Sequence, residues 1–314
     1  MTQDVEALGT VGARPQENTV GRRLKKSISQ WRKYPLGIIG LTIIILIVLI
    51  AVFAPVISPH QPREFAGRPL EGPSLSFPMG TNNLGQDVLA RAIYGAQVSI
   101  AVGFSAAVMA VFAGTFLGIV SGYVGGWVDL LIQRGLEVLA SFPGLVLALV
   151  MIAAIGQPRE SGSNIFVLAW QLRSLELAIA LAFIFGNMRV IRSAVLTERS
   201  LPYIEAARSI GCSPVRILGR HILPNVLAYV IVSFSTIIGI VILIEASLSF
   251  LGYGVSITTP SWGIDLSNRN REYFLQAPWL IFGPGIALSM TVLGFNFLGD
   301  ALRDMLDPRL RGSR

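Results

Sequence analysis

The sequence has little charge, one cysteine and two histidines. Only 14% of its 314 residues are charged, 53% are apolar, and the mean hydropathy is +0.63. Soluble domains carry about a quarter charged residues, so this composition argues against a water-soluble globule and against intrinsic disorder. A single cysteine cannot form an internal disulfide, and three scattered histidine and cysteine residues give no zinc, haem or iron–sulfur spacing.

Lysine is also scarce, which argues against a nucleotide site. A P-loop requires Gly-x-x-x-x-Gly-Lys-Ser/Thr, and Lys25, Lys26 and Lys33 follow no such loop. We find no Ser/His/Asp arrangement either. The sequence therefore predicts a chain that is not an enzyme and that binds no cofactor or metal of its own.

Long uncharged runs are abundant instead. About 20 apolar residues span a bilayer as a helix, and the sequence predicts an all-α polytopic membrane protein with spans at 36–57, 98–122, 136–156, 174–192, 226–250 and 278–299. The fourth span has only 12 uncharged residues, from Leu177 to Met188. It crosses the bilayer only if Arg189 and Arg192 snorkel from its end; the alternative is an interfacial or re-entrant helix.

Lysine and arginine lie mainly on one side of these spans. Eighteen of the 25 fall in the N-terminal segment, the C-terminal tail, the turn after the second span and the loop before the fifth. The positive-inside rule then places both termini in the cytoplasm. We read the net charge of +7 as topology and contact with anionic lipid, and not as a nucleic-acid site, because no aromatic residues alternate with the arginines.

The first apolar run is too long for a cleaved signal and is expected to be a signal anchor. The expected division of the chain is a basic cytoplasmic segment at 1–35, the first span at 36–57, an extracytoplasmic loop at 58–97, a transmembrane core at 98–299 and a cytoplasmic tail at 300–314. The core includes a cytoplasmic loop at 193–225.

Within the second span, Gly114, Gly118 and Gly122 form a small-residue ridge for close helix packing, inside the chain or against a partner. Pro143 and Pro284 are expected to kink their helices.

The cytoplasmic loop before the fifth span has the most unusual sequence. Pro202 is expected to begin a short helix and Gly211 to end it with a left-handed cap. Ser213 and Pro214 then begin a second short helix, which ends where Pro224 begins the fifth span. The two helices would lie across the cytoplasmic mouth of the bundle.

The first of these helices carries small residues and one acid. Ala206, Ala207 and Ser209 permit close approach of another backbone, and Glu205 supplies one acceptor. Such a helix suits docking into a groove of a partner protein. The alternative is an interfacial helix without a partner.

One charge, Glu245, lies clearly inside a span. Ionisable residues within membranes are often functional, so Glu245 is a candidate gate or path residue. The alternative is a Glu near the outer end of the fifth span that is half-solvated or hydrogen-bonded to a partner helix. One Glu is thin support for a proton or sodium motor.

The loop resembles the EAA loop of binding-protein-dependent ABC importer permeases. The matching residues are Glu205-Ala206-Ala207, Gly211 and Leu223-Pro224. About residues 30 to 310 resemble the peptide/nickel branch, in particular the C-type permease of dipeptide and oligopeptide importers, through segments 31–37, 79–95, 141–143, 220–225, 245–252, 259–263 and 298–308. Asn82 and Gln86 depart from the Asp and Arg usual in that branch, so an ion pair there is in doubt. Segment 157–175 is polar and individual to this chain.

The resemblance implies the type I permease fold and a place in a bacterial or archaeal cytoplasmic (inner) membrane. It implies a second related permease, one or two ABC ATPase subunits that bind ATP and Mg²⁺, and an extracytoplasmic substrate-binding protein. In that family the loop forms a coupling helix in a groove of the ATPase, which assigns Glu205, Ala206, Ala207, Gly211 and Pro224 to ATPase coupling. The outer loop 252–277 is expected to meet the binding protein or to shape the outer gate.

The substrate stays open at this point. Peptides are the most frequent substrates of the branch, and nickel, glutathione, sugars and opines are alternatives. An ATP-independent secondary transporter would show inverted repeats or buried ionisable pairs, and the sequence shows neither convincingly. A non-transport scaffold would tolerate substitution of Glu205 and Gly211.

Overall fold

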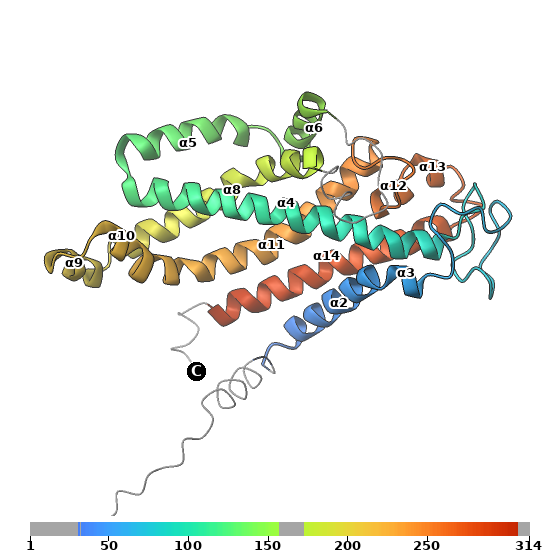
Figure 1. The fold of residues 1–314 in the computed structure, drawn as a ribbon, viewed down its shortest axis with the longest axis horizontal. Helices are drawn as coiled ribbons and strands as arrows, with labels where there is room; N and C mark the ends of the chain where they lie inside the picture. Colours follow the sequence, from blue (N-terminus) through green and yellow to red (C-terminus); the bar gives the residue numbers. More distant parts are fainter. Residues whose placement is uncertain (1–30, 32, 157–172, 307–314) are drawn as a thin grey trace, which may run out of the picture.

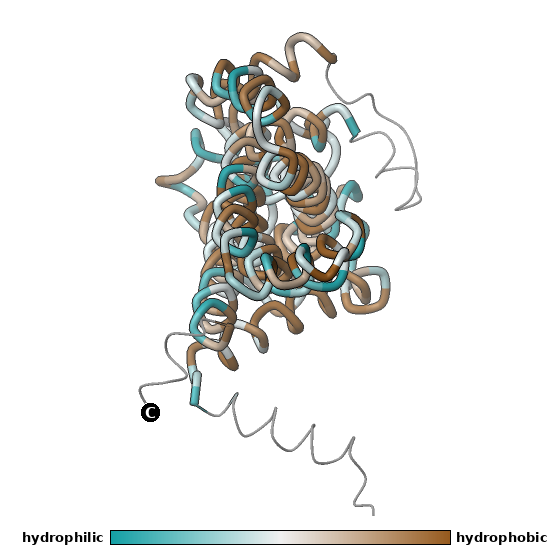
Figure 2. The backbone as a smooth tube through the Cα atoms, turned by 90° about the vertical axis from the view of Figure 1, so that its left-hand side faces the viewer, coloured by the Kyte–Doolittle hydropathy of each residue, from teal (hydrophilic) through white to brown (hydrophobic). Residues whose placement is uncertain are grey.

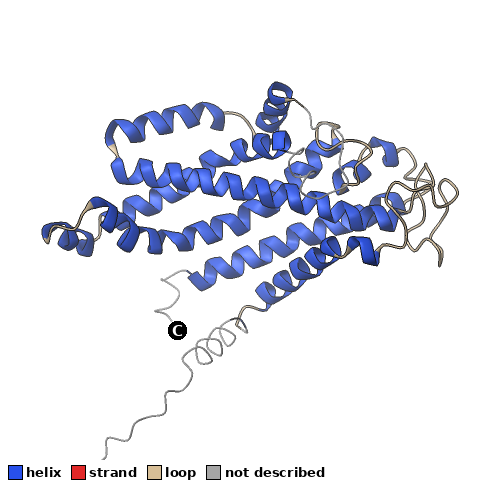
Figure 3. Cartoon of the chain, viewed as in Figure 1, coloured by secondary structure: helices blue, strands red, loops and turns tan. Residues whose placement is uncertain are grey.

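The computed structural model describes residues 31, 33–156 and 173–306. Helices joined by loops make up this part of the chain, and an isolated bridge pairs Thr81 with Asp87 (Figure 3). The expected all-α class is therefore confirmed. Segment 157–172, most of the stretch that we singled out as individual, and the basic segment 1–30 lie outside the described residues.

Five helices in the described part of the chain are long and apolar enough to cross a membrane. They are α2 (Pro35–Val52), α4 (Val88–Val124), α8 (Arg173–Arg199), α11 (Leu223–Phe250) and α14 (Trp279–Leu306). These helices run side by side along the long axis of the molecule (Figure 1), and a view turned by 90° shows hydrophobic turns interleaved with hydrophilic ones through the bundle (Figure 2). The shorter helices are α3 (Ala54–Ile57), α5 (Gly126–Ala140), α6 (Gly144–Ile155), α9 (Pro202–Ser209), α10 (Pro214–Ile217), α12 (Trp262–Leu266) and α13 (Asn268–Arg271).

The third span differs from the expected single helix over 136–156. Helices α5 and α6 are long and apolar enough to cross a membrane only when taken together, and they are bent by 93° across the break between them. Pro143 is the N-cap residue of α6. Proline has no N–H and disfavours a helical conformation in the residue before it, so Pro143 breaks the helix where we expected a kink. Pro284, in contrast, lies inside the continuous helix α14.

The fourth span is one continuous helix. Helix α8 has 27 residues, about 40 Å at 1.5 Å per residue. We expected Arg192 to extend from the end of this span towards the membrane surface. It forms an ion pair within the chain instead: its Nε and Nη2 donate to Asp129 Oδ1 and Oδ2 of α5 at 2.7 and 2.6 Å. The same carboxylate accepts from the Ser121 hydroxyl of α4. The ion pair therefore fastens α5 to α8 and α4.

The glycine ridge of α4 packs against α8 within the same chain. A Cβ atom at Gly114 would lie 2.8 Å from the carbonyl oxygen of Ile184, and one at Gly118 would lie 2.7 Å from that of Met188. Real Cβ atoms do not approach backbone this closely. The intramolecular alternative for this ridge is therefore confirmed.

Three hydrophobic clusters of buried residues lie in the described part of the chain, the smallest of them formed by Val88, Ala277 and Leu280. The largest lies between α4, α8, α11 and α14 and extends to Trp262 of α12. The second lies at the end of the bundle that carries α9, and we call it the tip cluster. Its buried members are Ile191, Ala194, Val195, Ile204, Ala207, Ile217, Ile222 and Val226. The tip cluster joins α8, α9, α10 and α11 into one packed unit.

Candidate functional site

Helix α9 has the ends that the sequence predicts. Pro202 lies in its first turn, where the missing N–H breaks no hydrogen bond. Gly211 has a φ of +82°, which glycine adopts without steric strain. The Cys212 N–H donates to the Ala207 carbonyl at 3.0 Å, which satisfies a carbonyl at the helix end. Glu205, Ala206 and Gly211 are all exposed.

Ala207 does not lie on the exposed face. It is buried with Ile204 in the tip cluster, because residues three apart share one side of a helix. The expectation that Ala207 is part of a small docking face is therefore wrong. The sequence reasoning also missed two apolar residues beside the turn, Ile210 and Val215, which are 81% and 82% exposed. Their signal was an apolar residue on each side of the Gly211 turn in an otherwise polar loop.

The second short helix is not a separate element. Ser213 caps it as expected, since its hydroxyl accepts from the Arg216 N–H. Helix α10 then continues through a π-helical turn, η1 (Leu218–Ile222), directly into α11. Pro224, which has no N–H for the regular ladder, is accommodated just after this wider turn. Exposed Pro224 therefore lies within a helix of 37 residues, Pro214–Phe250, and does not divide it.

Three polar side chains tie α9 to its neighbours. The Tyr203 hydroxyl donates to Glu198 Oε2 of α8 at 2.7 Å. Asn225 Nδ2 of α11 donates to the same Glu198 oxygen at 3.1 Å and to the Tyr203 hydroxyl at 3.0 Å. Burial and the Glu198 carboxylate raise the pKa of the Tyr203 phenol, which keeps it a neutral donor. We call these three residues the tip triad.

Helix α4 is held to the same end. Arg199 Nη1 donates to the carbonyl oxygens of Gly122 and Tyr123 at 3.1 and 2.8 Å. The Tyr123 hydroxyl donates to the Pro214 carbonyl at 3.1 Å. Together with the tip cluster, these contacts fasten α9 and α10 to α4, α8 and α11.

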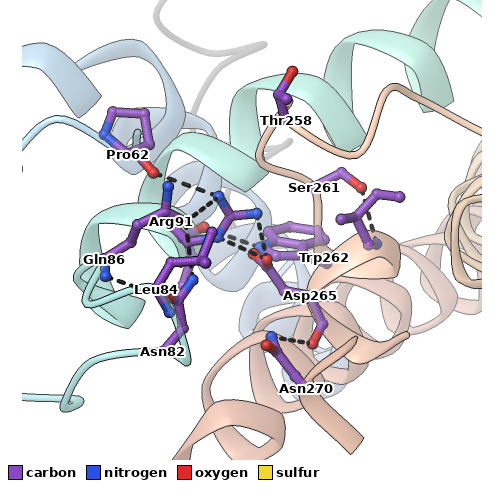
Figure 4. A network of polar contacts seen from close by, with 12 residues as sticks. Pro62, Asn82, Leu84, Gln86, Arg91, Thr258, Ser261, Trp262, Asp265 and Asn270 are labelled. Atoms are coloured by element: carbon purple, nitrogen blue, oxygen red, sulfur yellow. Dashed lines mark hydrogen bonds and ion pairs between the residues drawn. The ribbon is translucent and has the colours of Figure 1, made fainter. Parts of the chain in front are cut away.

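A second polar network lies at the opposite end of the bundle (Figure 4). Arg91 of α4 donates from Nε and Nη2 to Asp265 Oδ1 of α12 at 2.8 and 2.6 Å. Both side chains are buried, with 5% and 7% exposed. The Trp262 indole N–H donates to the Ala92 carbonyl at 3.0 Å. These contacts pin α12 against the beginning of α4.

Asn82 and Gln86 pair in this network as neutral amides. Asn82 Nδ2 donates to Gln86 Oε1 at 2.9 Å, and Arg91 Nη1 donates to the same oxygen at 3.2 Å. The Asn82 Oδ1 atom accepts from the Gln86 backbone N–H at 2.9 Å, which closes the turn. The turn is therefore held by two neutral amides, at the positions where the resembling family usually has an Asp and an Arg.

Glu245 is fully buried in the packing of α11. Its Oε1 accepts from the Ser249 hydroxyl one turn further along the helix at 2.8 Å. Of the readings that the sequence left open for Glu245, the half-solvated one is therefore wrong, and Glu245 lies on no exposed face of this chain. Within the described ranges, no three His, Cys, Asp or Glu side chains are grouped to hold a metal ion.

Comparisons with known proteins agree on one family. The family model described as "Binding-protein-dependent transport system inner membrane component" matches residues 114–312, and the N-terminal TM domain of oligopeptide transport permease C matches residues 23–73. The chain is 38% identical over 288 residues to the dipeptide transport system permease protein of Alkalihalophilus pseudofirmus, covering 91% of this chain and 90% of the relative. It is 37% identical over 270 residues to the glutathione transport system permease protein of Pectobacterium atrosepticum, covering 85% of each.

Proposed function

The chain belongs to the binding-protein-dependent transport inner membrane components, the membrane permeases of ABC importers, and we propose that it forms half of a peptide translocation path. The relatives that are named for dipeptide and glutathione transport support a short peptide as the substrate class. ATP and Mg²⁺ bind the partner ATPase subunits in this proposal, and a second permease completes the path. An extracytoplasmic binding protein delivers the peptide.

The exposed tip of α9 and α10 carries the proposal for ATPase coupling. Glu205 and Ala206 are exposed beside Ile210 and Val215, whose apolar side chains project from this packed unit. Exposed apolar groups rimmed by polar residues are typical of protein interaction surfaces. We therefore assign the contact with the ATPase to this surface, with Gly211 shaping the turn between its two sides. Ala207 packs behind this surface in the tip cluster, and exposed Pro224 lies beside it.

The contacts behind this surface suit the transmission of force. The tip cluster and the tip triad join α9 to α8 and α11, and Arg199 joins α8 to α4. A displacement of α9 by the ATPase would then move these three long helices together, as a rigid-body rocking motion requires. Since the α9 end meets the ATPase, it is the cytoplasmic end, in agreement with the arginine distribution.

The test is co-purification from cells that express the chain with its genomic neighbours. We expect Ile210→Asp and Val215→Asp to lose the ATPase and ATP-driven uptake, because a charge replaces an apolar contact. Leu75→Asp is the matched control for co-purification of the ATPase, since Leu75 is fully exposed in the loop at the other end. Full retention of ATPase and uptake in both tip variants would contradict the assignment.

The opposite end is proposed to meet the binding protein. Trp262 and Asp265 are buried in the fold, so deletion of this loop would test stability and not docking. Ile257 is exposed on the same loop. We expect Ile257→Asp to weaken uptake while the ATPase still co-purifies.

An ATP-independent transporter, the second candidate, predicts uptake by liposomes that lack ATP. Because Glu245 is buried, its proposed role as a gate residue requires that α11 rotates and exposes this side chain to the path.

A further inference from the structure

The long helices differ in what they expose. Helix α4 exposes Phe104, Phe112 and Phe116, which suit contact with lipid. Helix α8 instead exposes small, polar and charged residues at helical spacing, namely Gly186, Arg189, Ser193 and Thr197, with the apolar Val190 beside them. Helix α11 exposes Asn225, Tyr229 and Thr236 among apolar residues that include Leu227 and Ile231. The sequence hydropathy of α8 alone does not distinguish these faces.

A polar stripe on a membrane helix has a restricted set of neighbours. Polar and charged groups are costly against hydrocarbon, so they face protein or a water-filled path. Between α8 and α11 the structure has an open recess of about 420 Å³. The residues that line it are Arg189, Val190, Ser193, Ala194, Thr197 and Tyr229.

Arg189 is the charged group of this recess. Its guanidinium carbon lies 4.4 Å from the centre of the Phe185 ring, one turn earlier in α8, and this stacking holds the guanidinium plane. Arg189 forms no ion pair with any residue in the described ranges. Arg192, one turn further on, is by contrast paired with the Asp129 carboxylate. The donors of Arg189 are therefore available to an anion.

We propose that this recess binds the carboxylate of a peptide in transit, with Arg189 as the residue that recognises it. A guanidinium binds a carboxylate through two parallel hydrogen bonds, a geometry that an ammonium does not reproduce. Ser193 and Tyr229 line the same recess, and each carries a hydroxyl that can hydrogen-bond to the rest of the peptide. The proposal rests on the proposed function, and it adds a substrate feature that the chain itself selects. An anionic lipid head group presents similar oxygens and is the competing source.

The test uses the full importer in liposomes with saturating binding protein. Uptake of a dipeptide with a free carboxylate is compared with uptake of its C-terminal amide, in wild type and in Arg189→Gln. We expect Arg189→Gln to lower the acid-to-amide uptake ratio at least fivefold while the ATPase stays bound. Arg189→Lys should recover only part of the ratio. Arg134→Gln, at an exposed pair on α5, is the charge-matched control and should leave the ratio unchanged.

Three outcomes would overturn the inference. An unchanged ratio in Arg189→Gln would exclude carboxylate recognition by this residue. An equal loss of acid and amide uptake would indicate a structural role. A defect present only in liposomes with anionic lipid, and equal for both peptides, would assign the recess to a lipid head group. A wild-type importer that moves neither peptide would instead contradict the proposed function itself.

Discussion

Arg91 and Asp265, 174 residues apart in the chain, form a buried ion pair that joins the beginning of α4 to α12. The pair closes one end of the bundle, and the tip triad closes the other. Neither contact involves the apolar runs that define the spans. The two ends of this permease are therefore organised by polar contacts between segments that are distant in sequence.

Loss of one partner of the buried pair should destabilise the chain strongly. Arg91→Met leaves Asp265 buried without its cation, which typically costs about 3–5 kcal/mol. The double variant Arg91→Met/Asp265→Asn should recover part of that loss. Thermal unfolding in detergent measures both. Arg134→Met, at the exposed Arg134–Glu137 pair, should cost about 1 kcal/mol or less. Equal losses at the two sites would contradict the burial argument.

Tyr203→Phe should uncouple ATP hydrolysis from transport. The substitution keeps the ring and removes the hydrogen bonds to Glu198 and Asn225, each worth about 1 kcal/mol. We expect the ATPase to co-purify and hydrolyse ATP while uptake per ATP falls by two- to tenfold. Ser209→Ala is the control, because its hydroxyl bonds only to the Glu205 carbonyl of the same helix among described residues. An unaltered ratio of uptake to hydrolysis in Tyr203→Phe would remove the triad from the coupling path.

Gly211→Ala should strain the turn through its backbone alone. A Cβ there meets no atom within 4 Å, but the φ of +82° is unfavourable for alanine by about 1 kcal/mol. We expect weaker binding of the ATPase, because the strained turn displaces Ile210 relative to Val215. Gly219→Ala is matched, since its Cβ also meets open space and its φ is not positive. Binding that drops equally in both variants would point to the side chain and not to the backbone.

Gly118→Ala should separate α4 from α8. The new Cβ would lie 2.7 Å from the Met188 carbonyl oxygen, a contact that requires a helix shift and costs about 1–3 kcal/mol. Gly135→Ala is the control, since Gly135 lies in α5 with open space around its Cβ. It should be neutral or stabilise by up to about 1 kcal/mol. A thermal midpoint for Gly118→Ala at or above wild type would show that the two helices tolerate separation.

Much of the fold could be predicted from local sequence. Pro202 and Gly211 set the ends of α9, and Ser213 caps α10, because these residues act on their own backbone and that of near neighbours. The glycine ridge of α4 was recognisable as a packing surface. Its partner within the chain was identified only by the structure. The sequence predicted a kink at Pro143 in the third span, but it did not predict a break with a bend of 93°.

The candidate site shows where local sequence stops being sufficient. Glu205 and Ala207 are two residues apart in one motif, yet Glu205 is exposed and Ala207 is buried. Which side of α9 packs inward depends on Ile191 and Val226, which belong to other helices.

The sequence by itself determined that this chain has several helices apolar enough to span a membrane, and it determined both ends of the short helix α9. Hydropathy and helix capping act over a few residues, so local sequence is sufficient for both. Only the tertiary structure decided which charges are neutralised. Arg192 meets Asp129 and Arg91 meets Asp265, whereas Arg189 keeps its donors for a recess between α8 and α11. The reason is physical: an ion pair depends on distances across helices, and these distances follow from packing and not from position along the chain.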